Sequence, residues 1–328
     1  MKNQSNFVIS LDFELNWGVW DVVKLENYKS NLIGVQKVIP ELLDLFSKYN
    51  IEATFATVGF LFFDNKADLI SNLPLKKPSY SDKDLSPFIN QIKNVGSNED
   101  VDKFHFAKSL VKLVKSYNQE IASHTFSHFY CLEKGQSKAE FEADLQAFQK
   151  ISSKEDIELK SIVFPRNQYN KDYIVACKEA GIICYRGNEK AWIYKAKELN
   201  KDTLFIRLLR LLDSYINISG YNCYSNKFMK NDLIINIPSS RFLRPFSKKL
   251  AIFEKLRLAR IKKSMTYAAK NNLTFHLWWH PHNFGTNLSE NLQFLESILN
   301  HKEDLKRLYN FRSISMQNLA KELILENE

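Results

Sequence analysis

The chain lacks the long apolar runs that mark membrane-spanning and exported proteins. No segment approaches the roughly 18 apolar residues of a membrane span. The N-terminal stretch MKNQSNFVISLDFE also has no apolar run long enough for the hydrophobic region of a signal peptide. We therefore expect a cytoplasmic protein.

Cysteine pairs, linkers and repeats are lacking as well. The four cysteines show no C-x-x-C spacing, and a chain of 328 residues does not need disulfides, so free thiols are expected. The length suits one α/β barrel or two modest domains, but no Gly/Ser linker, low-complexity tract or repeat divides it. Because 45% hydrophobic and 25% charged residues are typical of soluble globular proteins and no linker divides the chain, we predict one folded domain over residues 1–328.

The positive charge is concentrated in one segment. The net charge is +9, and residues 241–263 hold nine Lys or Arg against one acid, Glu254. A nucleic-acid groove more often draws basic residues from several segments. We therefore expect no nucleic-acid partner.

Apolar runs of strand length alternate with segments of helical spacing. Strands separated by helices predict an α/β fold with a parallel sheet, here with about seven strands, enough to curl into a barrel. Residues 63–105 are long for a connection, which is typical of a functional loop or a lid. The apolar runs are residues 7–13, 53–62, 120–124, 161–165, 182–187, 233–238 and 273–280.

Two acids end the first of these runs. In ISLDFELNWG, Asp12 and Glu14 are two residues apart, so both side chains point to the same face of the strand. Carboxylates at the end of a buried strand need a compensating partner, either a cation or a proton shared between them. The alternative is that Glu14 lies past the strand end in water.

Two histidines follow the run at residues 120–124. We expect His124 and His128 to open a helix there, on one helical face, at the strand ends where barrels have their active sites. With one carboxylate they would make a three-ligand zinc site with an open position. The alternative is a solvated helix face.

The last run, FHLWWHPHNFG, carries further histidines. His276, Trp278 and His280 alternate onto one face, and His280 ends the strand. Because the ordinary pKa of histidine is near neutrality, His280 can act as a general acid. We interpret His276, lower on the strand, as structural. Trp278 can stack on a sugar, with core packing as the alternative.

Four segments, in this order, resemble the motifs of polysaccharide deacetylases of carbohydrate esterase family 4, with their chitooligosaccharide-deacetylase-like homology domain. They are SLDFE, EIASHTFSH, RNQYN and LWWHPH. The family motifs are usually written T-F-D-D-G, H-[ST]-x-x-[SN]-H-type, R-x-P-Y-G and L-x-L-H. The resemblance spans residues 7 to about 285. It implies a distorted (β/α)7-type barrel with a long insertion after the second strand.

The resemblance also implies catalytic roles, position by position. Asp12 matches the catalytic base, and Arg166 matches the arginine that orients it. Tyr169 matches the tyrosine whose backbone N–H helps to hold the oxyanion. His280 matches the histidine that protonates the leaving group, and His282 is a close rival. RNQYN lacks the proline and glycine of the family motif, so a structural salt bridge is the alternative role for Arg166.

A divalent metal ion, zinc first, is implied as the cofactor. His124 and His128 match the two metal histidines of the family. The metal-binding aspartate of the family directly follows the base, but Phe13 fills that place here. Glu14 is one methylene longer and comes one position later, so we expect it to reach the same ion.

Together these residues predict a metal-dependent hydrolase that removes an N-acetyl group from an acetamido sugar. The amine is a poor leaving group and needs an acid, which favours N- over O-deacetylation. The expected substrate is a polysaccharide or a surface-glycan precursor, and the candidate sugar-binding residues are Trp17, Trp192 and Trp278. One alternative is a carbohydrate-binding protein that has lost the chemistry. Another is a hydrolase of a different C–N bond, such as that of a formamide.

The basic segment, residues 241–270, bears on location. Leu250, Phe253 and Leu256 recur every three residues among Lys and Arg, which predicts a helix with an apolar and a basic side. One interpretation is that the helix packs its apolar side on the barrel. The other is that it lies on an anionic membrane surface at the inner face of the membrane, or binds the diphosphate of a lipid- or nucleotide-linked sugar.

Overall fold

The structure, a computed structural model, describes residues 4–196 and 203–326. Its strands form one parallel sheet in the order β6-β5-β4-β3-β2-β1-β8-β7, with β9 also paired to β1. The strands are β1 (Asn6–Phe13), β2 (Ala53–Thr57), β3 (Glu120–Ser123), β4 (Ser161–Ile162), β5 (Cys184–Tyr185), β6 (Ile235–Asn236), β7 (Arg241–Phe242), β8 (Thr274–Trp279) and β9 (Arg312–Ser313).

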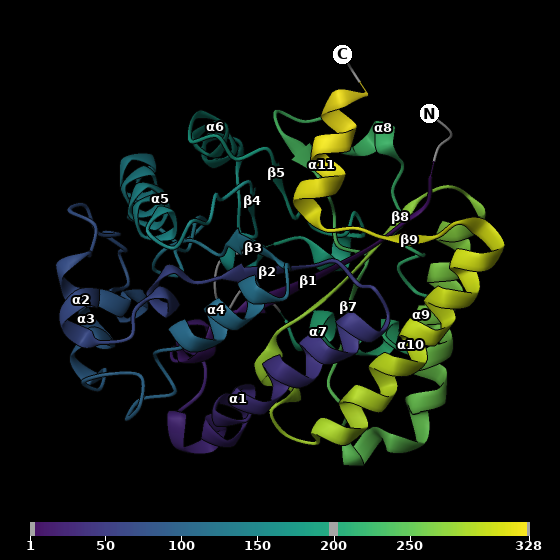
Figure 1. Cartoon of the computed structure of the whole chain (residues 1–328), viewed down its shortest axis with the longest axis horizontal. Coiled ribbons are helices and arrows are strands. Elements are labelled where there is room, and N and C mark those ends of the chain that lie inside the picture. The colour runs from purple at the N-terminus through teal and green to yellow at the C-terminus, as the bar shows by residue number, and fades with distance from the viewer. Residues whose placement is uncertain (1–3, 197–202, 327–328) are drawn as a thin grey trace.

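Helices surround this sheet (Figure 1), so the α/β barrel expected from the sequence is confirmed. Each of the seven apolar runs overlaps one strand, whereas β7 and β9 lie outside these runs. The helices are α1 (Leu25–Lys48), α2 (Lys66–Ser71), α3 (Pro87–Asn90), α4 (Lys108–Ser116), α5 (Lys138–Ser153), α6 (Lys171–Glu179), α7 (Leu204–Asp213), α8 (Asn226–Met229), α9 (Glu254–Lys270), α10 (Leu288–Tyr309) and α11 (Met316–Leu325).

The sheet curls into a distorted barrel that a connection, and not a strand pair, closes. Between β6 and β7, the backbone N–H of Ser239 donates to the carbonyl of Gly187 at 2.9 Å. The next N–H, of Ser240, donates to the carbonyl of His276 in β8 at 2.8 Å. The connection between β6 and β7 therefore bridges the end of β5 and strand β8.

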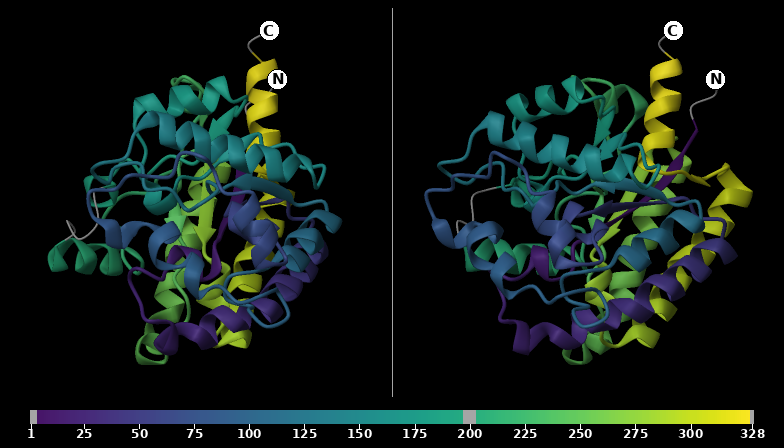
Figure 2. Two further views of the ribbon diagram at one scale, coloured as in Figure 1. Left: turned by 90° about the vertical axis from the view of Figure 1, so that its left-hand side faces the viewer. Right: turned by 60° about the vertical axis from the view of Figure 1, so that its left-hand side comes forward.

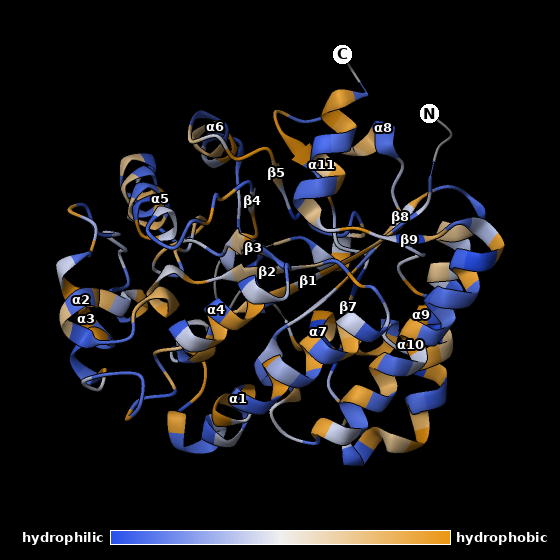
Figure 3. Cartoon of the chain, in the orientation of Figure 1, coloured by the Kyte–Doolittle hydropathy of each residue, from blue (hydrophilic) through white to orange (hydrophobic). Residues whose placement is uncertain are grey.

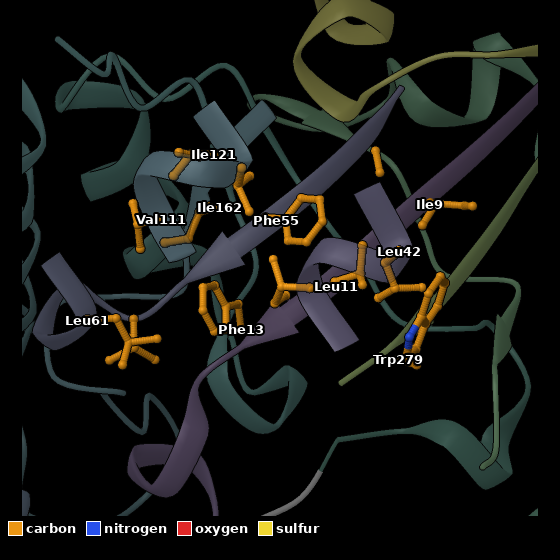
Figure 4. Packing of buried hydrophobic residues seen from close by; sticks show 14 of the residues in the cluster. Ile9, Leu11, Phe13, Leu42, Phe55, Leu61, Val111, Ile121, Ile162 and Trp279 are labelled. Atoms are coloured by element: carbon orange, nitrogen blue, oxygen red, sulfur yellow. The ribbon is translucent and has the colours of Figure 1, made fainter. Parts of the chain in front are cut away.

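Strand β1 lies in the middle of the sheet and is buried along its whole length. Its outward side chains Ile9, Leu11 and Phe13 pack in the main core with Leu42 of α1 and Trp279 of β8 (Figure 4). Because side chains alternate along a strand, Ser10 and Asp12 point to the opposite side, into the barrel. Both are buried polar groups that need partners there.

The insertion at residues 63–105 is folded against the start of the chain. It contains α2, α3 and two short 3-10 helices. The backbone N–H of Asn16 donates to the carbonyl of Phe104 at 3.1 Å, and the indole N–H of Trp17 donates to the carbonyl of His105 at 2.8 Å. Tyr80 of the insertion accepts a hydrogen bond from the backbone N–H of Tyr130 at 2.8 Å.

The basic segment is helical only in part. After β7 it forms a 3-10 helix over Lys248–Phe253, and α9 follows. Arg241, Arg257 and Arg260 are buried. Arg241 and Arg260 both pair with Asp213 of α7, so part of the positive charge is neutralised inside the protein. No described helix is long and apolar enough to cross a membrane, and the helices mix hydrophilic and hydrophobic residues (Figure 3).

Candidate active site

A buried glutamate, Glu14, lies at the centre of four histidines. It directly follows β1 and is 3% exposed. Its Oε2 lies 3.2 Å from Nε2 of His124 and 3.1 Å from Nε2 of His128. Its Oε1 lies 3.2 Å from Nε2 of His282 and 3.5 Å from Nε2 of His280. Glu14 is therefore not in water beyond the strand.

The loop after β3 presents His124 and His128, and the predicted helix is wrong. Residues 124–130 form no regular structure, and Thr125 and His128 have left-handed backbones with φ of 61° and 59°. Asp144 of α5 accepts the backbone N–H groups of Phe126 and Ser127 at 2.7 and 3.1 Å. These N–H groups thus bond to a distant carboxylate and not within a helix, and the loop brings both rings to Glu14.

Hydrogen bonds behind these two rings fix which nitrogen faces Glu14. Nδ1 of His124 donates to the carbonyl of Val163 at 2.8 Å, because a carbonyl can only accept. Nδ1 of His128 lies 3.2 Å from Oη of Tyr130, whose own proton goes to Asp21 at 2.9 Å. When each ring carries one proton, on Nδ1, its Nε2 therefore turns a lone pair towards Glu14.

This donor set fits a divalent cation. Two imidazole nitrogens and one carboxylate are the usual ligands of catalytic zinc. With bonds of about 2.0–2.1 Å, tetrahedral ligand atoms are roughly 3.3 Å apart. The separations of 3.1 and 3.2 Å from Glu14 to the rings of His128 and His124 match this value. The three ligand atoms all lie within 4.8 Å of one another.

Arg186, which directly follows β5, binds Asp12, whereas Arg166 does not. Nη1 and Nη2 of Arg186 bind Oδ1 and Oδ2 of Asp12 at 2.6 and 2.7 Å, a bidentate pair, and both side chains are almost fully buried. Arg166 has a left-handed backbone, φ 54°, and its side chain pairs with Asp21 and lies 4.0 Å above the ring of Tyr130. The expected contact between Arg166 and Asp12 is therefore absent.

Sequence reasoning missed Arg186, although a signal was present. The run IICYRG has strand character, and an arginine at its end needs a buried partner. In the structure Arg186 also donates to Oγ of Ser10 at 3.0 Å and to Oδ1 of Asn167 at 3.0 Å. Its guanidinium lies 4.2 Å from the ring centre of Trp278. Asn167, in the motif that contains Arg166, thus helps to orient the arginine that pairs with Asp12.

His280 and His282 differ in exposure. The side chain of His280 is 23% exposed, and its Nε2 lies 3.5 Å from Glu14 and 3.8 Å from Oδ2 of Asp12. Its Nδ1 lies 3.3 Å from Oδ1 of Asn283. His282 is buried, and its Nδ1 lies 2.8 Å from Oη of Tyr28. Of the two, only His280 is open to a molecule arriving from solvent.

The pKa directions follow from burial and charge. Burial acts to raise the pKa of Asp12, but the charge and hydrogen bonds of Arg186 outweigh it and lower the pKa. Burial likewise acts to raise the pKa of Glu14, and the surrounding histidines hold it well below its usual value. Burial lowers the pKa of His128 and His280. We therefore describe Asp12 and Glu14 as ionised at neutral pH, and the rings of His128 and His280 as neutral.

His276 is structural, as its depth suggested. Both of its nitrogens are bonded, Nδ1 to the carbonyl of Ile237 at 3.1 Å and Nε2 to Oγ of Ser10 at 2.8 Å. Burial first, and then nearby Arg186, lowers its pKa to about 3, so the ring is neutral.

The predicted sugar-binding aromatics are in three different environments. Trp17 is fully buried between Phe60 and His105, so it cannot stack on a sugar. Trp278 is partly buried beside His280, and its indole N–H has no hydrogen-bond partner among the described residues. Trp192 is 67% exposed in a 3-10 helix, Trp192–Tyr194, that follows β5.

Tyr169 packs its ring between Phe164 and Tyr185, and its Oη accepts from the backbone N–H of Asn188 at 3.4 Å. The role expected for its backbone N–H stays a prediction.

The chain is similar to known deacetylases in sequence and in fold. Residues 33–184, a little under half of the chain, match the family model "Polysaccharide deacetylase". This stretch includes His124, His128, Arg166 and Tyr169, and it begins after Glu14. A search of curated proteins finds no match.

Among solved structures, a candidate polysaccharide deacetylase from Mycobacterium smegmatis has a TM-score of 0.59 at 10% identity, over 100% of this chain and 93% of that one. A probable polysaccharide deacetylase from Pseudomonas aeruginosa has a TM-score of 0.54 at 9% identity, over 98% and 90%. An allantoinase has a TM-score of 0.51 at 9% identity, over 96% and 88%. At these identities the structures show the shared fold alone. Residues 33–184 are therefore similar to the polysaccharide deacetylase family in sequence, and the chain shares its barrel fold with these three structures.

Proposed function

We propose that the protein is a metal-dependent deacetylase that hydrolyses the N-acetyl group of an acetamido sugar, with the whole chain acting as one catalytic domain. The observation that carries the proposal is the juxtaposition of Asp12, the Glu14 cluster and a partly exposed His280. A candidate base, ligands for a cation and a candidate acid lie in one cluster, in which Nε2 of His280 is 3.8 Å from Asp12 and 3.5 Å from Glu14. A carbohydrate-binding protein without chemistry would not need all three.

Glu14, His124 and His128 would hold the ion, for which zinc fits best. When bound, a divalent ion supplies a Lewis acid that polarises an acyl oxygen and lowers the pKa of water. The neutral state of His128, which burial favours, keeps its nitrogen available to an ion. The carbonyl of Val163 and the hydroxyl of Tyr130 hold the two rings in place from behind.

Asp12 is proposed as the base that takes a proton from the attacking water. Arg186 keeps it ionised and fixes its plane. The guanidinium of Arg186 uses one lone pair on each carboxylate oxygen of Asp12, and each oxygen retains another lone pair. Oδ2 is the oxygen on the side of His280, so we assign proton transfer to it.

His280 is proposed as the acid that protonates the departing nitrogen. Asn283 accepts from Nδ1, so Nε2 is the nitrogen that would take up the proton that Asp12 removes from water and pass it to the departing nitrogen. His282 is less suited, because it is buried and its two nitrogens are engaged with Tyr28 and Glu14. We therefore expect His280→Ala to lower kcat more than His282→Ala.

Acetate release from a panel of N-acetyl and N-formyl sugars, with and without a chelator, tests the proposal. We expect acetate from an N-acetyl sugar, loss of rate with chelator and recovery with zinc. Formate release without acetate release would support hydrolysis of another C–N bond instead. Binding of sugars without release of either acid would support the carbohydrate-binding alternative.

We further propose that the substrate is a surface-glycan precursor linked to a lipid diphosphate, and that the protein contacts an anionic membrane. The basic segment supports this, because Lys248, Lys249 and Lys255 are exposed beside apolar side chains that are also exposed. Helix α7 adds to this surface and lies at the margin of the molecule in both views of Figure 2. The exposed apolar residues are Leu204, Phe205, Leu208, Leu212, Ile252, Phe253 and Leu256.

The two parts of this surface touch each other. The rings of Tyr215 and Phe253 lie 6.0 Å apart, and Arg244 donates to Oγ of Ser214 at 2.8 Å. Tyr194, in the connection that follows β5, donates to Asp213 at the end of α7 at 2.7 Å. The surface is thus tied to a loop at the C-terminal strand ends, the edge on which Asp12 and Glu14 lie.

Co-sedimentation with anionic and with neutral vesicles across a salt series tests membrane contact. Each basic residue near an anionic surface is worth roughly 1 kcal/mol, so we expect binding to anionic vesicles that salt weakens. Two variants should weaken it, Phe205→Asp with Leu208→Asp in α7, and a fourfold Lys→Gln change at Lys248, Lys249, Lys262 and Lys263. Equal sedimentation with and without anionic vesicles would exclude a membrane role.

A further inference from the structure

Glu14 divides its four histidines between its two oxygens. Oε2 faces His124 and His128, which are the proposed ligands of the catalytic ion. Oε1 faces the other pair, His282 at 3.2 Å and His280 at 3.5 Å. These three ligand atoms also lie within 4.8 Å of one another, so the two triads share only Glu14.

The second triad has the donors and the spacing of a zinc site. Its separations of 3.2 and 3.5 Å from Glu14 bracket the roughly 3.3 Å expected between tetrahedral ligands. When Nδ1 of His280 donates to Oδ1 of Asn283, Nε2 keeps a lone pair. When Nδ1 of His282 donates to Oη of Tyr28, Nε2 of His282 also keeps a lone pair.

We propose that Glu14, His280 and His282 form a second divalent-cation site, and that an ion there inhibits the enzyme. Glu14 would bridge two ions, one on each oxygen, as carboxylates do in two-metal sites with ions roughly 3.5–4 Å apart. A coordinated Nε2 of His280 has no proton to give to a leaving group. The inhibition, though not the binding, rests on the proposed role of His280 as the acid.

The surroundings make the second site the weaker one. The first triad is buried, whereas the side chain of His280 is 23% exposed and gives this site a path to solvent. Two dications would share the charge of Glu14. The next carboxylate, Asp12, lies 3.8 Å from His280 but is already paired with Arg186. We expect the second ion to bind at least tenfold more weakly than the first, which corresponds to about 1.4 kcal/mol.

Titration of the metal-free protein with Co²⁺ tests the site without reference to activity. Elemental analysis gives the ions bound per chain, and electron paramagnetic resonance distinguishes an isolated ion from a coupled pair. We expect two ions in the wild type and a coupled signal at the second equivalent. His282→Ala should bind one ion and show no coupling. His280→Ala, which changes a more exposed side chain, should do the same if His282→Ala fails to fold.

The outcomes separate the site from its effect. One ion per chain in the wild type at millimolar Co²⁺, or a second ion that both variants retain, would overturn the site. If the site is present, the deacetylation rate should rise with the first equivalent and fall with the second. In His282→Ala, the activity that remains should not fall as metal is added. A rate that rises with the second ion would overturn the inhibition, and absence of any deacetylation would contradict the proposed function while the ion count still decides the site.

Discussion

Arg186, and not Arg166, should control the ionisation of Asp12. The perturbation is Arg186→Gln, which removes the cation from a buried bidentate pair. Removing one partner of a buried pair costs about 3–5 kcal/mol, because the other charge is left unpaired. With an unfolding entropy of about 2.1 cal/mol/K per residue, roughly 0.7 kcal/mol/K for this chain, the melting temperature should fall by about 4–7 °C.

The same change should move the pH profile of the reaction. Arg186 holds the pKa of Asp12 below its ordinary value against the opposing effect of burial. Without the guanidinium, burial raises the pKa, so the acidic limb of kcat/KM should move to higher pH. In the wild type, this pair stabilises the fold above the unfolded-state pKa of Asp12, and that stability is lost as the pH falls through the lower folded-state pKa.

Two variants serve as controls. Arg166→Gln removes a cation that pairs with Asp21 and makes no contact with Asp12, so its acidic limb should stay in place. Arg186→Lys keeps the charge but cannot bind both carboxylate oxygens as a fork, so its limb should lie between those of the wild type and Arg186→Gln. If Arg166→Gln moves the limb as far as Arg186→Gln does, our account of how Asp12 is held is wrong.

Three other predictions concern the parts of the site separately. Gly18→Ala should reduce the metal content measured by elemental analysis, because an added Cβ would lie 2.0 Å from Cδ of Glu14 and displace the carboxylate. An unchanged metal content would show that Glu14 is not a ligand. Asp12→Asn should abolish turnover and retain the metal, whereas Glu14→Gln should lose both, and the reverse pattern would exchange their roles. Burial raises the pKa of Asp144 to about 6. Ionisation of this carboxyl should therefore lower the free energy of unfolding above pH 6 by about 3 kcal/mol, relative to pH values below 4. Urea unfolding should show this pH dependence in the wild type and not in Asp144→Asn.

Local patterns were sufficient for the fold and for part of the site. The apolar runs predicted the strands because each strand is buried by its neighbours and by helices, which requires continuous apolar side chains. The two-residue spacing of Asp12 and Glu14 predicted that they share a face, because alternation along a strand is a property of the backbone. A spacing of four residues was a less reliable sign of a helix. The spacing of His124 and His128 suggested a helix, but Asp144, a residue distant in sequence, holds the segment as a loop.

The sequence by itself determined which groups are available: a parallel barrel, two acids at the end of its first strand, and histidines at the ends of two others. Only the tertiary structure decided which groups pair. Arg186 holds Asp12 because the curled sheet brings the end of β5 across the barrel to β1, although β2, β3 and β4 lie between them in the sheet. Arg166 has a left-handed backbone, and its side chain pairs with Asp21 instead. Trp17 is buried in the core and cannot contact a sugar, because the insertion at residues 63–105 folds over it. Partner choice for a charged side chain depends on distances between strands that are far apart in sequence, and no local period encodes those distances.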